Sequence, residues 1–298
     1  MIDRLLRFAL LPVAIAFLPL TAEAGNPSPS FAVRIEGQGP AMILIPGFVS
    51  SGAVWDDVVA HYKTRYTCHV LTLPGFAGQP PIAGPVLPRI RDEIIEYIRT
   101  RQLVRPVLVG HSLGGFLALW VAATSPDLVG PIVSIDGVPF MPALGDPNAT
   151  VDSVRAQADQ MKALYASLSP EQLGMQSRMA FASMMSDPAR VETATRWAAA
   201  SDPGTASTTI AELMTTDLRE PIAAIRTPVL LVPAVKAFAS MPGGDERARA
   251  AYLAQVKRVP SHEVVPATNA LHFVMYDDLP FLLRTMDQFL APVLRSER

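Results

Sequence analysis

Residues 105–123 constrain the fold of this 298-residue chain more than any other stretch. Residues 107–109 read Val-Leu-Val, which predicts a short buried strand, and the apolar, small-residue run 116–123 predicts a helix. Between them lies the turn Gly110-His111-Ser112-Leu113-Gly114-Gly115. A β-carbon at Gly110 or Gly114 would collide with neighbouring backbone on so sharp a turn, and Gly115 lets the helix pack closely. Ser112 is therefore expected at a helix N-terminus, where free N–H groups can receive negative charge. A serine that merely caps a helix is the alternative.

The composition supports a sizeable hydrophobic core and argues against a nucleic-acid partner. Half of the residues are hydrophobic and 17% are charged, so a sizeable core is available. The net charge is -2 and no basic run is present, which argues against a nucleic-acid ligand and favours a small partner. Cys68 is the single cysteine, so no internal disulfide can form, and a buried thiol is expected.

The first 24 residues predict an export signal. Arg4 and Arg7 precede the apolar run 8–20, and Ala22-Glu23-Ala24 offers a small-x-small cleavage site. A membrane anchor is less consistent, because the run is shorter than the ~20 residues of a span and is interrupted by prolines. We therefore expect a periplasmic or secreted protein with no stable membrane insertion once the signal is removed. The oligomeric state is not indicated.

Strand and helix patterns alternate through much of the chain. Strands are predicted at 31–36, 41–45, 68–73, 107–109, 132–135, 229–232 and 262–265. Helices are predicted near 55–61, 90–101, 245–256 and 279–290, and the four prolines of 79–88 predict a stiff connection. The fold class is therefore α/β, a mostly parallel sheet flanked by helices.

Residues 138–221 interrupt this alternation. Their composition is typical of helices, and Pro170, Pro188 and Pro203 each stand where a helix could begin. We predict a helical cap inserted into a core formed by 25–137 and 222–298. Seven of the twelve methionines fall here, and Met141, Met161 and Met184 are candidates for an adaptable apolar pocket, although they could equally pack the helices together.

A serine nucleophile needs a base to take its proton and a third group to orient that base. His272 lies in the loop between the last predicted strand and the last helix, on the sheet edge where Ser112 is expected. His111 is adjacent to Ser112, but side chains of neighbouring residues on a sharp turn diverge. His272 is therefore the candidate base.

These motifs together resemble the α/β-hydrolase superfamily, in particular serine esterases and lipases with a helical cap. The resemblance runs from Ile45-Pro46-Gly47-Phe48 through the serine turn to Leu271-His272-Phe273. It implies the chain order serine, acid, histidine, and an oxyanion hole formed by the backbone N–H groups of Phe48 and Leu113. The family often has His-Gly before the oxyanion residue, where this chain has Pro46-Gly47.

The acid departs from the family's pattern. Members usually carry it shortly after the penultimate strand, where this chain has Ala237. Asp245 is the first carboxylate beyond and is well placed to cap the next helix. Asp136 instead ends the strand after the serine unit, where some similar members, notably haloalkane dehalogenases, carry the acid. We favour Asp136 and keep Asp245 as the alternative. Asp277 and Asp278 are expected to cap the last helix.

The resulting hypothesis is an exported serine hydrolase that cleaves carboxylic esters of apolar substrates through an acyl-enzyme. Action on a lactone, a thioester or a carbon–carbon bond, or a perhydrolase reaction, would use the same residues. A non-catalytic binding protein is the alternative of a different class. No metal or organic cofactor is expected, because no His-Glu-x-x-His pattern is present and the glycine-rich turns lack a phosphate-binding lysine.

Overall fold

A seven-stranded sheet forms the centre of the computed structural model, which describes residues 28–239 and 243–296. The expected export signal, residues 1–24, lies outside the described residues. The strand order is β1-β3-β2-β4-β5-β6-β7, and only the edge strand β1 runs antiparallel to its neighbour. The strands are β1 (Ala32–Gly37), β2 (Ala41–Ile45), β3 (Thr67–Thr72), β4 (Val107–His111), β5 (Ile132–Ile135), β6 (Val229–Val232) and β7 (His262–Val264). The predicted fold class is confirmed.

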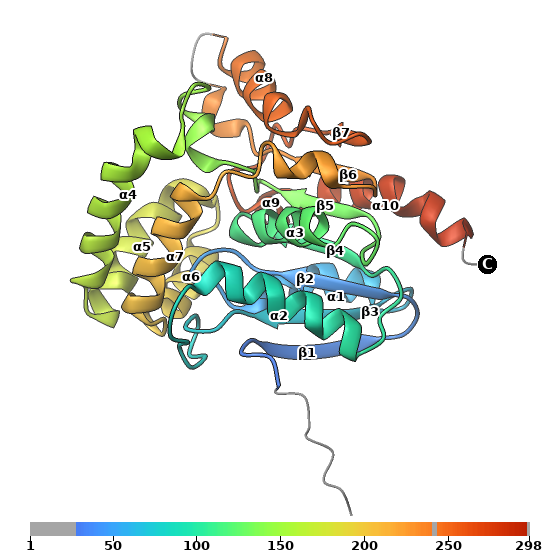
Figure 1. The fold of residues 1–298 in the computed structure, drawn as a ribbon, viewed down its shortest axis with the longest axis horizontal. Coiled ribbons are helices and arrows are strands. Elements are labelled where there is room, and N and C mark those ends of the chain that lie inside the picture. Colours follow the sequence, from blue (N-terminus) through green and yellow to red (C-terminus); the bar gives the residue numbers. More distant parts are fainter. Residues whose placement is uncertain (1–27, 240–242, 297–298) are drawn as a thin grey trace, which may run out of the picture.

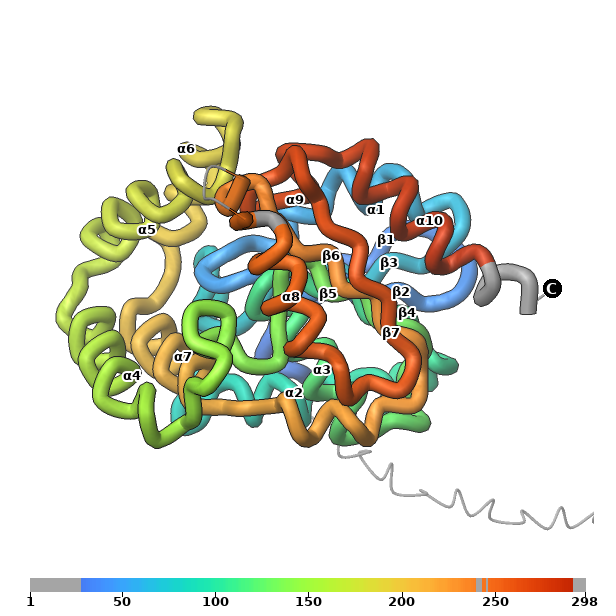
Figure 2. The backbone as a smooth tube through the Cα atoms, turned by 90° about the horizontal axis from the view of Figure 1, so that it is seen from above, coloured from blue at the N-terminus to red at the C-terminus, as the bar shows by residue number. Residues whose placement is uncertain are grey.

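Helices cover both faces of the sheet. In Figure 2, α1 (Asp56–Tyr62) and α10 (Leu279–Ser296) lie on one face, and α2 (Val86–Thr100) and α3 (Leu113–Thr124) lie on the other. α8 (Gly244–Val256) precedes β7, and the short α9 (Val274–Asp277) precedes α10. The central strands β2, β4, β5 and β6 are almost wholly buried, as continuous apolar strands between two helical layers should be.

Residues 138–221, all of which the structure describes, contain helices and no strand. Four α-helices lie beside one end of the sheet in Figure 1, and we call them the helical segment. They are α4 (Val151–Ala166), α5 (Pro170–Met184), α6 (Pro188–Ala199) and α7 (Pro203–Thr215). Each of the three predicted prolines occupies the first turn of a helix, where its missing N–H costs no hydrogen bond.

The predicted start of α2 was wrong. α2 begins at Val86 rather than Ile90, so Pro88 belongs to its first turn. No side chain of the preceding residues caps this end. Glu212 of α7 does so from a distance, because its carboxylate accepts hydrogen bonds from the N–H groups of Val86 and Leu87 at 2.7–3.1 Å. The helical segment thus supplies the cap that the local sequence of α2 lacks.

The sheet register brings several chain segments to one edge. Ile45 pairs with Gly110, and His111 pairs with Ile135, so the residues that follow β2, β4 and β5 emerge side by side. The pairing continues one step further, since Ser112 N–H donates to Ile135 C=O at 2.9 Å and Asp136 N–H donates to Val232 C=O at 2.9 Å. Within the described part of the chain, no helix combines the length and the apolar character needed to cross a bilayer.

Candidate active site

Ser112 occupies a strained turn between β4 and α3. Its φ is 53° and its ψ is −116°, and its hydroxyl makes no capping hydrogen bond to the helix. A β-carbon on Gly110 would lie 2.1 Å from Gly114 C=O, and one on Gly114 would lie 2.0 Å from Ile45 C=O. Both glycines are therefore required by close backbone approach. A positive φ on serine is costly, and the side chain it presents is not used to stabilise the helix.

His272 and Asp136 form a hydrogen-bonded pair at the same edge. His272 Nδ1 lies 2.5 Å from Asp136 Oδ2, and the two side chains are 24% and 8% exposed. A carboxylate only accepts, so Nδ1 carries the proton and Nε2 keeps a free lone pair. Asp136 has φ 50°, a conformation that aspartate tolerates better than most residues. The alternative acid, Asp245, is the second residue of α8, and its side chain is outside the described part of the structure.

The second oxygen of Asp136 is also fully engaged. Oδ1 accepts from Ala234 N–H at 2.9 Å and from the Tyr252 hydroxyl at 2.6 Å. Burial and the adjacent Asp136 charge raise the pKa of Tyr252 far above its usual value, so the phenol remains a donor. Sequence reasoning did not find Tyr252, because it lies in an alanine-rich helix with no motif around it.

His111 links the serine turn to the histidine loop. It is fully buried, and its Nε2 donates to His272 C=O at 3.0 Å. Its Nδ1 has no partner among the described residues and faces Gly47, where an added β-carbon would lie 3.0 Å away. Burial and the nearby His272 hold the pKa of His111 well below its usual value, so the ring is neutral. The sequence predicted only that the His111 side chain points away from Ser112. In the structure, this side chain also holds the backbone of His272 in place.

The two predicted oxyanion residues flank Ser112. Leu113 is the first residue of α3, and Phe48 follows Gly47, where an added β-carbon would lie 3.4 Å from Ser112 Cβ. Val49 has φ 46°, which turns the chain sharply after Phe48. The Phe48 ring packs edge-on against Phe76 and against Tyr165 of α4.

Of the three candidate methionines, Met184 alone has a described contact with the histidine loop. Met184 ends α5, and its carbonyl accepts from Phe273 N–H at 3.2 Å, directly beside His272. Met141 is half-buried against the main core. Met161 is half-buried on α4, and no described contact joins it to Ser112, His272 or Asp136.

Asp278 and Asp277 behave differently from each other. Asp278 Oδ1 accepts from Phe281 N–H at 3.3 Å, as a residue that caps α10 should. The prediction for Asp277 was wrong, because its carboxylate binds Leu271 N–H, at 2.9 Å, and Ser186. It therefore ties the histidine loop to the turn after α5.

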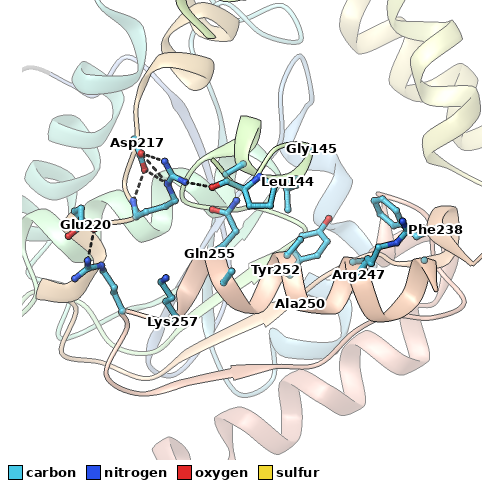
Figure 3. A pocket seen from close by; sticks show the side chains of 18 residues that line it. Leu144, Gly145, Asp217, Glu220, Phe238, Arg247, Ala250, Tyr252, Gln255 and Lys257 are labelled. Atoms are coloured by element: carbon cyan, nitrogen blue, oxygen red, sulfur yellow. Dashed lines mark hydrogen bonds and ion pairs between the residues drawn. The ribbon is translucent and has the colours of Figure 1, made fainter. Parts of the chain in front are cut away.

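A cavity of about 980 Å³ lies next to this site but is not centred on it. It is lined by one side of α8, by Ala143, Leu144, Gly145 and Pro147, and by Asp217, Arg219 and Glu220, several of which Figure 3 labels. Ser112 and His272 do not line it, whereas Tyr252 does. Among the described residues, no three His, Cys, Asp or Glu side chains gather so that they could hold a metal ion.

Comparison with known proteins decides the family. The sequence profile described as "Alpha/beta hydrolase family" matches residues 42–282. The chain belongs to the alpha/beta hydrolase family. Among solved structures, a thermophilic esterase from Thermogutta terrifontis superposes on this alpha/beta hydrolase with a TM-score of 0.72 at 17% identity, covering 88% of this chain and 93% of that one. That likeness is one of fold.

Curated relatives match this alpha/beta hydrolase over part of their length. A pimeloyl-[acyl-carrier protein] methyl ester esterase from Aeromonas hydrophila is 32% identical over 137 residues, which are 45% of this chain and 52% of the relative. A 2-(acetamidomethylene)succinate hydrolase from Mesorhizobium japonicum is 32% identical over 139 residues, 46% of this chain and 50% of the relative. The matched region thus spans about half the length of each.

Proposed function

We propose that this alpha/beta hydrolase is a serine hydrolase that cleaves carboxylic esters of apolar substrates through an acyl-enzyme. The observation that carries the proposal is the 2.5 Å hydrogen bond between His272 Nδ1 and Asp136 Oδ2, at the sheet edge where the strained Ser112 turn emerges. A hydroxyl, a correctly protonated imidazole and a buried carboxylate are the three groups that nucleophilic acyl transfer requires.

The chemistry follows from these groups. The Ser112 hydroxyl attacks the ester carbonyl while His272 Nε2 takes its proton. The oxyanion is stabilised by the N–H groups of Phe48 and Leu113, and His272 then returns the proton to the departing alcohol. Water, activated by the same imidazole, releases the acid and regenerates the serine. The esterase activity in the names of relatives supports an ester as substrate.

The helical segment would act as the cap over this site. Tyr165 of α4 touches the Phe48 ring, and Met184 of α5 binds the backbone of Phe273. Met141, Met161 and Met184 would then supply apolar contacts for the substrate, with Met184 the nearest to the histidine loop. A bulky apolar ester would therefore be recognised by the helices rather than by the sheet.

A fluorophosphonate probe tests the nucleophile without knowledge of the natural substrate. We expect covalent labelling of the wild-type protein, mapped to Ser112 by mass spectrometry, and no labelling of Ser112→Ala. Ser183→Ala is a matched control, because Ser183 is exposed on α5 and its hydroxyl bonds only its own helix. Absence of labelling in a folded wild-type sample would favour a binding protein on this fold instead.

We also propose export, on the strength of residues 1–24 alone. Sequencing of the mature protein's N-terminus should find Gly25 first if cleavage follows Ala24. Recovery of the intact leader on protein retained in the cytoplasm would contradict this proposal.

A further inference from the structure

Two polar side chains on one face of α8 bind residues 136–140, the segment that follows β5. One binds Asp136 at its start and the other binds Phe140 at its end. Tyr252 donates to Asp136 at the start of this segment, at 2.6 Å. One helical turn later, the buried Gln255 amide accepts from Phe140 N–H at 3.2 Å and donates to Phe140 C=O at 2.9 Å. Figure 3 shows both side chains projecting from the same side of the helix.

We propose that Tyr252 is a positioning residue for the catalytic acid, an inference that rests on the proposed serine hydrolase function. Asp136 leaves β5 in a left-handed conformation, so the strand itself does not fix the direction of its carboxylate. The Tyr252 hydroxyl and Ala234 N–H both bind Oδ1, and this leaves Oδ2 directed at His272 Nδ1. Tyr252 therefore acts through Asp136 and does not touch the reacting atoms.

The hydroxyl also moderates the negative charge of the acid. Each hydrogen bond donated to a carboxylate delocalises its charge and weakens its attraction for a neighbouring cation. With the phenol in place, Asp136 orients the imidazole but stabilises its protonated form less than a bare carboxylate would. Loss of the Tyr252 hydroxyl should therefore strengthen the attraction between Asp136 and a protonated imidazole.

Besides Asp136, the titratable groups around the histidine loop include His111, Asp277 and Lys236. On the sheet side, the neighbouring ring is the neutral His111, with ring centroids 4.6 Å apart. Asp277 binds the backbone of Leu271 and the side chain of Ser186, which also accepts from Lys236 Nζ at 3.2 Å. None of these contacts involves Tyr252, so we expect a changed pH profile in a Tyr252 variant to report on the Asp136 contact.

The test is Tyr252→Phe, compared with Tyr97→Phe. Tyr97 is equally buried, since both tyrosines are 4% exposed. Its hydroxyl forms a hydrogen bond with His69 Nδ1 at 2.7 Å, and this contact does not involve Ser112, Asp136 or His272. For Tyr252→Phe we expect kcat on an aryl ester to fall about tenfold with little change in KM, which is the loss expected for one hydrogen bond to a charged group. The acid limb of kcat/KM should move to higher pH, and the His272 Nδ1–H proton resonance should shift. Tyr97→Phe should change none of these.

A second variant keeps the test decisive if Tyr252→Phe does not fold. Site-specific replacement of Tyr252 by a fluorotyrosine keeps the ring and strengthens the donor, so the acid limb should move to lower pH. Unchanged profiles in both variants would overturn the positioning role. Ser112→Ala is assayed in parallel. If Ser112→Ala retains activity, the proposed function and this inference both fail. If Ser112→Ala is inactive and Tyr252→Phe behaves like the wild type, only the inference is overturned.

Discussion

Ser112 and Asp136 both have a φ that residues other than glycine rarely adopt. Both have a positive φ, 53° and 50°, and both follow directly after neighbouring parallel strands. Such conformations cost free energy and persist only where the surrounding structure enforces them. Here the ladder hydrogen bonds from Ser112 N–H and Asp136 N–H to the adjacent strands fix the two residues. The nucleophile and the acid of the proposed mechanism are thus both among the positive-φ residues of the described chain.

Asp136→Asn should lower kcat/KM by about 10³–10⁴-fold. Asparagine tolerates the left-handed backbone, so the fold is retained, but its amide N–H₂ opposite His272 favours the tautomer that protonates Nε2. That tautomer cannot accept the serine proton. The measurement is aryl ester hydrolysis by purified protein, with Asp245→Asn as the comparison, expected within about twofold of wild type. Equal and mild effects of the two substitutions would contradict the role assigned to Asp136.

At the scale of elements, α2 illustrates how a helix can depend on a distant part of the chain. Its first N–H groups are satisfied by Glu212 of α7 rather than by a local cap. Burial raises the pKa of this carboxyl, against the lowering effect of the two backbone N–H groups, so the charged form is held at some cost. We therefore expect the helix to require an acceptor oxygen from this residue rather than a charge.

Substitutions of Glu212 should separate these two effects. Glu212→Ala removes the acceptor for two backbone N–H groups and should lower the free energy of unfolding by about 1–2 kcal/mol. Glu212→Gln keeps an acceptor oxygen and removes the buried charge, so its change should stay within about 0.5 kcal/mol. Urea denaturation at neutral pH measures both. If Gln destabilises as much as Ala, the charge itself is required.

The elements that sequence predicted well are those whose signals are local. Buried strands appear as short apolar runs, and the helix starts of α5, α6 and α7 are marked by prolines. The start of α2 was placed four residues late, because its cap comes from Glu212, which is 126 residues away from Val86. Tyr252 and Gln255 could not be found for the same reason: their partners are set by how α8 packs on the loop after β5.

At the scale of the whole molecule, two buried histidines couple stability to pH. His111 and His69 are both buried, and burial lowers the pKa of each. Below about pH 6.5 the unfolded chain binds protons that the folded rings do not, so stability should fall as the solution is acidified from that point. The lowered pKa values of Asp287 and Glu93 add a further loss only at more acidic pH.

His111→Gln should make this dependence shallower. Removal of one such histidine should reduce the slope of unfolding free energy against pH by up to about 1.4 kcal/mol per pH unit below pH 6.5. Glutamine can still donate to His272 C=O, which limits the structural change. Urea denaturation of both proteins between pH 7.5 and pH 5 gives the slopes. Identical slopes would show that His111 does not resist protonation in the folded protein.

The position of Asp136 has a consequence for how this protein can be altered. Nucleophile and acid both come from one continuous β4–α3–β5 unit. Among the described residues between β6 and α8, the N–H of Ala234 binds the acid. In family members that carry the acid after β6, that connection holds a catalytic residue. Here the residues beyond Ala234 include neither the proposed nucleophile nor the proposed acid. Foreign peptide grafted downstream of Phe238 should leave esterase turnover intact, which makes this connection a natural place to build a new recognition element beside the catalytic edge.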